Sequence, residues 1–377
     1  MRIIGKRVAS ARSLRFAAVL ALVASGCSSC PGPQRASGRT VRDLAGRQVT
    51  VPENVERLIA IGPGSLRLVA YLGAVDRVVG LEEMEKRMAR DPYVRPYAAT
   101  LDDDFLRLPV VGAGGAGVLP DAERVMLCRP DLLVVVALDP GQVDNLQERT
   151  GVPALYLSYG ELGVWRAEAR VSLSLLGEVL GLGERAARLE AAISSLQEDL
   201  ERRTSDLPEK DRPFAYFGGL SYKGSHGLDS TEAGYLAGRM AGARNLADTV
   251  GPSGHFFVDR EKILAWNPDF LFIDASSRLI VDEDLEHNRD FYRLLDASRA
   301  GRAYSLLPYN AYNTNVELAL INAYFIGKTL YPGRFGDVEI AEKARDIIET
   351  FLGFRPAGEL PACRPLRFPE TGPVEWN

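Results

Sequence analysis

The sequence predicts an α/β protein of two Rossmann-like lobes, each built on a central parallel sheet and joined by one long bridging α-helix. Three observations lead to this fold class. Short apolar runs alternate with amphipathic stretches in both halves of the chain, which is typical of βα units around a parallel sheet. One helix–strand joint occurs twice, and a long amphipathic segment without Gly or Pro separates the two halves.

The elements of each half follow from the period of the apolar residues. In the first half, short apolar runs predict strands at Leu58–Ile61, Val78–Leu81, Val110–Val111, Leu132–Val136 and Ala154–Leu157. Helical spacing predicts helices at Ser65–Leu72, Asp121–Leu127 and Gln142–Arg149. In the second half, we expect strands at Phe214–Phe217, Phe270–Asp274 and Ala303–Leu306. The corresponding helices are expected at Arg260–Ala265, Asn315–Leu330 and Glu339–Leu352.

The repeated joint is a helix, a Pro-Asp break and a buried strand. It runs from Glu123 to Pro130-Asp131 in the first half and from Glu261 to Pro268-Asp269 in the second, with the same spacing. The helix ends in both places because Pro disfavours helical geometry in the residue before it. A joint of this kind is common in α/β proteins, but its recurrence at equivalent places favours two lobes of related topology.

The bridging helix is predicted over residues 183–206. Leu189, Ile193, Leu196 and Leu200 recur on one face, and charged residues cover the rest. At 1.5 Å per residue such a helix is roughly 30 Å long, enough to connect two lobes and stiff enough to resist large closure. We therefore expect lobes at residues 39–182 and 207–355, and a Pro-rich tail at 356–377.

The N-terminus has the features of an export signal. Residues 1–15 carry five basic residues and no acidic one, and the apolar run 16–24 is too short to cross a bilayer of ~30 Å as a helix. Small residues then precede Cys27, as in a bacterial lipobox, although Ala24 stands where Leu is commoner. We expect a signal peptide at 1–26, lipidation of Cys27 and a tether at 27–38; the alternative is a plain secreted protein cleaved nearby.

Composition restricts the function. Of 377 residues, 46% are hydrophobic and 25% charged, which excludes wholesale disorder. The 50 acidic residues outnumber the 45 basic ones, so a nucleic-acid-binding surface over the whole protein is not expected. Because five basic and no acidic residues lie in 1–26, the net charge changes from −5 to −10 once that segment is removed.

Motifs of covalent chemistry or metal binding are weak. The three His residues lack metal-ligand spacing, and no nucleophile elbow, zinc-protease or Walker A motif occurs. Gly112–Gly117 spells GxGxxG, but Val-Leu-Pro follows it in place of the helix that a dinucleotide site requires. The CxxC of Cys27 and Cys30 has no strand or helix around it, so redox chemistry is not expected.

Several segments resemble the periplasmic iron-siderophore and cobalamin binding proteins of ABC importers. They are Val49–Gly62, Leu72–Gly80, the runs that begin at Arg129 and Asn267, Leu306–Asn315 and Ala323–Pro332. The resemblance extends over about residues 40–353. It implies two α/β lobes joined by one long helix, with the ligand held in the cleft between them.

The resemblance also implies a function. We expect a solute-binding lipoprotein that delivers an iron complex, such as a ferric siderophore, to an ABC permease and its ATPase subunit. Such a protein carries no cofactor of its own, binds no nucleic acid and is lipid-anchored in the cell envelope, in the periplasm or on the outer face of the cytoplasmic membrane. The alternatives are a cobalamin or haem binder, an envelope enzyme that acts on a metal chelate, and a receptor-like sensor.

Ligand contacts are expected in loops beyond the carboxyl ends of the strands, where ligands of parallel α/β sheets lie. Tyr and Asn side chains offer aromatic faces and neutral hydrogen bonds, whereas basic side chains neutralise an anionic ligand. The candidate residues are Arg67, Gly114, Gly115, Tyr222, Lys223, His226, Tyr309, Asn310, Tyr312, Asn313 and Asn315. Each has an ordinary structural alternative, as a turn residue or as part of a lobe rim.

Two further expectations concern the surface. Members of the resembled family present a Glu on each lobe to the permease, but Arg67 and Arg239 stand at those positions here. Either neighbouring acids such as Glu82, Glu83 or Glu232 replace them, or the permease surface differs, or Arg67 points into the cleft.

An export compartment also permits a disulfide between Cys128 and Cys363, which would fix the C-terminal tail to the first lobe.

Overall fold

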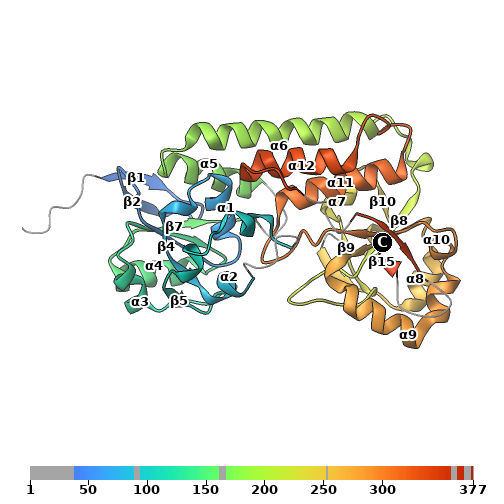
Figure 1. Ribbon diagram of the computed structural model, residues 1–377, viewed down its shortest axis with the longest axis horizontal. Helices are drawn as coiled ribbons and strands as arrows, with labels where there is room; N and C mark the ends of the chain where they lie inside the picture. Colours follow the sequence, from blue (N-terminus) through green and yellow to red (C-terminus); the bar gives the residue numbers. More distant parts are fainter. Residues whose placement is uncertain are drawn as a thin grey trace, which may run out of the picture. The chain divides into compact units, whose positions relative to one another are not determined.

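The computed structural model describes residues 38–88, 94–160, 167–251, 254–357, 363–368 and 375–376 (Figure 1). These residues belong to one structural unit, which spans residues 37–377. The predicted signal peptide, most of the tether and Cys27 lie outside the described residues. Within the described residues, no helix is both long enough and apolar enough to span a membrane.

The first lobe has a five-stranded sheet in the order β5-β4-β3-β6-β7, and all of its neighbouring strands are parallel. Its strands are β3 (Leu58–Ile61), β4 (Val78–Glu82), β5 (Val110–Gly112), β6 (Leu132–Val136) and β7 (Ala154–Leu157). A separate hairpin consists of β1 (Gly38–Arg42) and β2 (Gln48–Pro52). Its helices are α1 (Ser65–Tyr71), α2 (Glu83–Met88), α3 (Ala122–Cys128), α4 (Pro140–Thr150) and α5 (Ala167–Val179). The predicted strands are confirmed, because runs of buried aliphatic residues mark a sheet that helices cover.

The second lobe has an eight-stranded sheet in the order β11-β9-β8-β12-β13-β14-β15, with β10 also beside β8. Its strands are β8 (Phe214–Gly218), β9 (Ser230–Ala233), β10 (Arg244–Asn245), β11 (Gly254–Phe257), β12 (Phe270–Asp274), β13 (Ala303–Leu306), β14 (Pro365–Arg367) and β15 (Glu375–Trp376). Only β10, β8, β12 and β13 pair in parallel. The predicted parallel centre of this sheet is confirmed, and antiparallel strands extend it. These are β9 and β11 beyond β8, and β14 and β15 of the C-terminal tail beyond β13.

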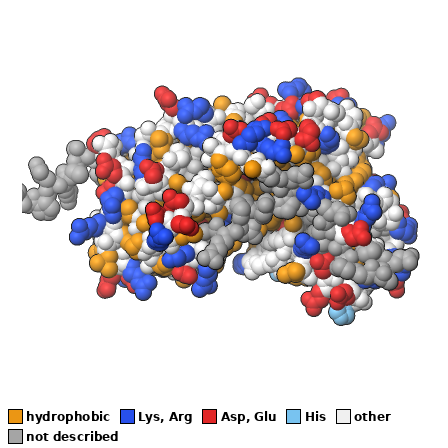
Figure 2. Space-filling model, in the orientation of Figure 1, with side chains coloured by type: hydrophobic (Ala, Val, Ile, Leu, Met, Phe, Trp, Pro, Cys, Tyr) orange, Lys and Arg blue, Asp and Glu red, His pale blue; other side chains and the backbone are white. Residues whose placement is uncertain are grey.

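The remaining helices are the long α6 and six helices of the second lobe. Their bounds are α6 (Gly183–Thr204), α7 (Leu236–Met240), α8 (Arg260–Trp266), α9 (Arg278–Leu294), α10 (Asp296–Arg299), α11 (Val316–Leu330) and α12 (Ile340–Leu352). The sequence did not predict α2, α5, α7, α9, α10 or the antiparallel strands, since their apolar residues are short runs or are interrupted by charges. On the face shown in Figure 2, charged side chains of both signs gather over α6 and α12.

The repeated joint has the same structure in both lobes. α3 and α8 end on a residue in the left-handed conformation, Arg129 at φ 50° and Asn267 at φ 43°. After the Pro, Asp131 Oδ2 accepts a hydrogen bond from the backbone N–H of Arg57 at 2.9 Å, and Asp269 Oδ2 accepts one from Phe214 at 2.8 Å. Each Asp thus fixes the start of the neighbouring parallel strand, β3 or β8, which explains why Pro-Asp recurs.

α6 packs against α5 of the first lobe and against α7, α11 and α12 of the second (Figure 1). One hydrophobic core is continuous across these elements, with Leu189, Ile193 and Leu200 fully buried. The lobes are therefore joined by shared packing as well as by the helix, which opposes large movements of one lobe against the other.

Cys128 and Cys363 are both free thiols. Cys128 is buried in the first lobe among the side chains of β3, β5 and β6, whereas Cys363 precedes β14 in the second lobe and contacts Asn322. The disulfide that the sequence permits is therefore not formed, because the two thiols lie in the cores of different lobes.

Replacing Asp269 with Ala should destabilise the second lobe. The backbone N–H of Phe214 would lose its acceptor, and we expect the free energy of unfolding to fall by about 1–3 kcal/mol. Chemical denaturation measures this change, with the exposed Asp103 changed to Ala as the control. Equal stability of the two variants would contradict the strand-fixing role.

Candidate functional site

The predicted ligand residues separate into two groups. The first, which we call the interlobe cluster, comprises Arg67, Glu82, Glu85, Arg95, Tyr97, Gly114, Gly115 and the loop 309–315. The second, the aromatic patch, lies on the second lobe and comprises Tyr222, Lys223, His226, His255 and Phe257. The first group includes four first-lobe residues that sequence analysis did not propose as ligand contacts, namely Glu82, Glu85, Arg95 and Tyr97.

Arg67 connects the lobes. It lies on α1 of the first lobe and is 0% exposed, and its guanidinium donates to the second-lobe loop 309–315. Nε donates to Asn315 Oδ1 at 3.0 Å, Nη1 to the carbonyl of Thr314 at 3.1 Å, and Nη2 to the carbonyl of Ala311 at 2.9 Å. The guanidinium therefore holds this loop against the first lobe.

The loop in turn contacts the first lobe through Tyr312 and Asn313. The hydroxyl of Tyr312 accepts from the backbone N–H of Gly115 at 3.0 Å and donates to Glu82 Oε2 at 3.1 Å. Asn313 donates to the carbonyl of Pro63 at 3.2 Å. Tyr312 and Asn313 have φ of 52° and 75°. Asn tolerates this left-handed conformation, but for Tyr312 it costs roughly 1–2 kcal/mol, so these contacts and those of Arg67 stabilise a strained turn.

A buried link lies beneath the loop. The hydroxyl of Tyr71 on α1 donates to the carboxyl group of Glu317 on α11 and accepts from the backbone N–H of Val316 at 3.2 Å. Burial raises the pKa of Glu317, while the Arg67 charge and the Tyr71 hydrogen bond oppose that shift. The first and second lobes thus share a buried polar network as well as an apolar core.

Arg95 contributes a buried charge whose hydrogen bonds are incomplete. It is 1% exposed, and Nη1 donates to Glu85 Oε2 at 2.9 Å and to the Tyr97 hydroxyl at 2.7 Å. Nε and Nη2 are buried and have no hydrogen-bond partner, and neither has Glu85 Oε1. The guanidinium carbon lies 5.6 Å from the centre of the Tyr312 ring, so these free donors are next to the interlobe loop.

Sequence reasoning missed Arg95 because no motif marks it. It stands in Val-Arg-Pro-Tyr, between two predicted strands, in a stretch without helical or strand periodicity. The one available signal is its position after β4, in a connection at the carboxyl edge of the first-lobe sheet, where ligands of parallel sheets are expected.

Glu82 ends β4 and is 1% exposed. Its Oε2 accepts from the backbone N–H of Gly62 at 3.0 Å and from Tyr312, while Oε1 has no partner. The pKa of Glu82 is raised to about 7, because burial, and to a smaller extent the charge of Glu85, outweigh the hydrogen bonds from Gly62 and Tyr312 that lower it. At neutral pH this carboxyl is therefore neutral in a large fraction of molecules.

Gly114 and Gly115 allow the close approach of the loop. A Cβ on Gly114 would lie 2.9 Å from the Tyr312 hydroxyl and 3.1 Å from Glu82 Oε2. Both glycines have positive φ, at 81° and 122°. Any side chain at Gly114 would separate Tyr312 from the first lobe, which accounts for glycine at this position.

The aromatic patch stands apart from the interlobe contacts. The Tyr222 ring stacks on the His255 ring with centroids 4.4 Å apart, and the ring of Phe257 meets the rings of both His255 and His226 edge-on. Tyr222 is 45% exposed and Phe257 54%. Lys223 is exposed beside the Tyr222 ring.

Tyr309 and Asn310 begin the loop but do not face solvent freely. Tyr309 is buried edge-on against Tyr235, and Asn310 pairs with Thr314 in an isolated bridge that closes the loop. Both residues shape the turn that carries Tyr312.

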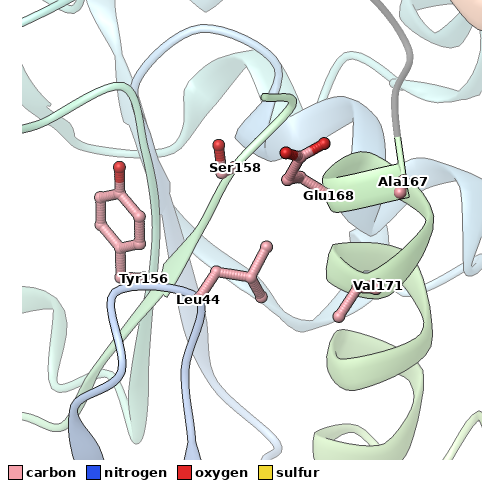
Figure 3. A pocket seen from close by; sticks show the side chains of 6 residues that line it. All are labelled: Leu44, Tyr156, Ser158, Ala167, Glu168 and Val171. Atoms are coloured by element: carbon pink, nitrogen blue, oxygen red, sulfur yellow. The ribbon is translucent and has the colours of Figure 1, made fainter. Parts of the chain in front are cut away.

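Metal ligands do not converge in the part of the chain that the structure describes, where no group of three or more His, Cys, Asp and Glu side chains is placed to hold an ion. A pocket of about 370 Å³ lies on the first lobe, between the end of β7 and the start of α5 (Figure 3). It is lined by Leu44, Tyr156, Ser158, Ala167, Glu168 and Val171 and contains none of the predicted ligand residues.

The two arginines at the expected permease-docking positions differ in exposure. Arg239 is exposed on α7, whereas Arg67 is fully buried and cannot present its charge to a partner in this conformation. Glu82 is also buried, so it cannot replace a docking Glu, whereas Glu83 and Glu232 are partly exposed.

Comparison with known proteins gives a consistent result. Residues 58–309 match the family model described as periplasmic binding protein. A curated relative, the molybdate-binding protein MolA of Haemophilus influenzae, is 23% identical over 334 residues, which are 83% of this chain and 90% of the relative.

Solved structures share the fold. MolA of Haemophilus influenzae bound to molybdate has a TM-score of 0.66 at 20% identity, over 84% of this chain and 99% of that one. CeuE of Helicobacter pylori with Ni(II) bound has a TM-score of 0.62 at 18% identity, over 85% and 97%. At these identities the similarity shows the two-lobe fold alone, and the ligands differ between the two proteins.

Changing Arg67 to Met should release the loop 309–315. Its carbonyls and Asn315 would lose their donor, so we expect the free energy of unfolding to fall by about 3 kcal/mol and amide exchange in the loop to accelerate. Hydrogen-exchange mass spectrometry measures this, with the exposed Arg239 changed to Met as the control. Unchanged exchange in the loop would contradict the role assigned to Arg67.

Proposed function

The chain belongs to the periplasmic binding protein family, and from this premise we propose that it captures a small metal oxyanion between its two lobes. It is a substrate-binding protein of an ABC transporter and not an enzyme. Members of this family work in the periplasm.

The observation that carries the proposal is the pair of free donors on Arg95. A guanidinium buried without full hydrogen bonding is costly, and Nε and Nη2 together form the two-pronged donor that binds two oxygens of one anion. Tyr312 lies over this guanidinium, so an oxyanion bound there would be enclosed by the interlobe loop. The molybdate named for the relative MolA belongs to the same chemical class.

A ferric siderophore-like chelate is the second candidate. The aromatic patch favours it, because the exposed rings of Tyr222 and Phe257 give flat apolar faces on which an organic chelate packs, and Lys223 adds a positive charge beside them. In this case the ligand would be larger and would contact the second lobe first. Cobalamin and haem are further candidate ligands that would pack on the same aromatic side chains.

The partners follow from the transporter class. We propose that the protein delivers its ligand to a permease driven by a separate ATPase subunit, and that a lipid on Cys27 holds it at the membrane. The acidic charge of the chain, −10 without residues 1–26, supports docking on a basic permease surface. It also means that an anionic ligand depends on local positive charge, which Arg95 provides.

Changing Arg95 to Met should weaken molybdate binding by a factor of about 100 or more, because two charge-assisted hydrogen bonds are lost at about 1.5–3 kcal/mol each. Since Met would leave the buried Glu85 without its ion-pair partner, the double variant Arg95→Met with Glu85→Gln is measured as well. Isothermal titration with sodium molybdate gives the affinities.

The matched control for these variants is Arg87→Met, which removes an exposed arginine from α2. Wild-type affinity in this control and loss of binding in both Arg95 variants would support the oxyanion site. Tight molybdate binding by the double variant would contradict it.

A thermal-shift screen separates the two ligand candidates. A ligand present well above its Kd stabilises the folded state by a few kcal/mol, so we expect a shift with molybdate and a smaller one or none with ferric siderophores, haem and cobalamin. A shift only with ferric chelates, lost when Tyr222 is changed to Ala, would support the second candidate in place of the first.

The lipid anchor is tested separately. We expect the wild-type protein to fractionate with membranes and to incorporate a labelled fatty acid, whereas Cys27→Ser should do neither, because the thiol is the site of acylation. Cys128→Ser, a change at a buried thiol, should behave like the wild type. Membrane association that survives the Cys27 change would argue against the anchor.

A further inference from the structure

We propose that Glu82 is a specificity-determining residue of the interlobe site, where its protonated carboxyl donates a hydrogen bond to the bound oxyanion and makes capture depend on a proton. This inference rests on the proposed function. It adds a second ligand-contacting group and a dependence of the oxyanion affinity on pH. It concerns a residue that sequence analysis considered only as a surface acid.

Besides Thr314 Oγ1, buried atoms without partners occur in two adjoining places in the interlobe cluster. Arg95 supplies two free donors, Nε and Nη2, and Glu82 and Glu85 each supply one free oxygen, Oε1. Tyr312 joins these places, since its ring lies 5.6 Å from the guanidinium carbon of Arg95 and its hydroxyl donates to Glu82. A ligand that satisfies the guanidinium alone would leave the carboxyl oxygens unsatisfied.

The hydrogen bonds of Glu82 determine where its proton resides. Oε2 already accepts from Gly62 and Tyr312, so a proton on this carboxyl belongs to Oε1, the oxygen without a partner. In that state Oε1–H is a buried donor, and an oxyanion, which has only acceptors, supplies the missing partner. An ionised Glu82 would instead place a second carboxylate beside Glu85 and repel the same ligand.

The groups around Glu82 leave its charge without a direct counterion. Glu85 faces it from α2 and Tyr312 from the loop 309–315, and Arg95 pairs with Glu85. Among the described elements packed against β4, the strands β3 and β5 contain no charged residue, and Glu123 and Arg124 of α3 are exposed. The neutral form of Glu82 is therefore favoured by its surroundings.

The direction of the pH dependence follows from these contacts. The pKa of Glu82 in the folded, ligand-free protein is about 7, above the ordinary 4.5 of a Glu, mainly because of burial. Below pH 7 the carboxyl is already neutral and the oxyanion binds without proton uptake. Above pH 7 binding requires the carboxyl to take up one proton, so the affinity falls by about tenfold per pH unit.

The test is isothermal titration of molybdate into the full chain at about pH 6 and about pH 8.5, in buffers of different ionisation enthalpy, which reports proton uptake by linkage. Molybdate has already lost both protons over this range, so a pH slope arises from the protein. We expect at least tenfold weaker binding at the higher pH, with close to one proton taken up per ligand.

Glu82→Gln keeps the shape and cannot ionise. We expect it to bind molybdate at both pH values with less than a threefold difference and without proton uptake. The control Glu83→Gln, at the partly exposed neighbour, should keep the wild-type slope. Thermal melts check that both variants fold. The number of protons that the wild-type protein takes up per bound molybdate tests the inference even if a variant does not fold.

The outcomes separate this inference from the proposed function. Tight molybdate binding with no pH slope and no proton uptake would overturn the role of Glu82 and leave the oxyanion site in place. A slope that persists in Glu82→Gln would also overturn it. No binding of molybdate at either pH would remove the proposed oxyanion function and this inference with it.

Discussion

The guanidinium of Arg67 is the interaction on which the arrangement of the site depends. It is buried in the first lobe, yet its hydrogen bonds end on the second-lobe loop 309–315. Together with the contacts of Tyr312 and Asn313, Arg67 holds a strained turn against the first lobe, where the Tyr312 hydroxyl meets Glu82. The same turn places the Tyr312 ring beside the free donors of Arg95. Arg67 acts here as a link between lobes, and the ligand-binding role expected of it is better suited to Arg95.

The fold was largely predictable because continuous runs of apolar residues mark the strands of a sheet that is buried on both faces. The five parallel strands of the first lobe and the joint at Pro130-Asp131 were read directly from such runs. The antiparallel strands β9, β11, β14 and β15 were not, since they are short and contain polar or Pro residues, and their pairing depends on distant contacts. The tail 356–377 can add strands to the sheet only because β13 has an edge available for pairing. The sequence does not show which strand lies at the edge of the sheet.

The candidate site was predictable only in part, for a related reason. The sequence shows that Tyr and Asn are concentrated at 309–315, but the first-lobe residues that this loop contacts lie 197 to 250 positions earlier. Arg95 and Glu85 carry no motif, and their importance arises from burial and from the hydrogen bonds they lack. Conversely, Tyr222, Lys223 and His226 were grouped with the loop because all follow strands, although they form a separate exposed patch.

The central claim is that an oxyanion is bound between the lobes by Arg95. Co-crystallisation with molybdate and a difference map at the molybdenum absorption edge test it most directly. The account predicts one peak with its oxygens in hydrogen-bonding distance of Arg95 Nε and Nη2, beneath Tyr312. A peak at the aromatic patch of Tyr222 and Phe257, or an ordered structure with no peak between the lobes, would contradict it.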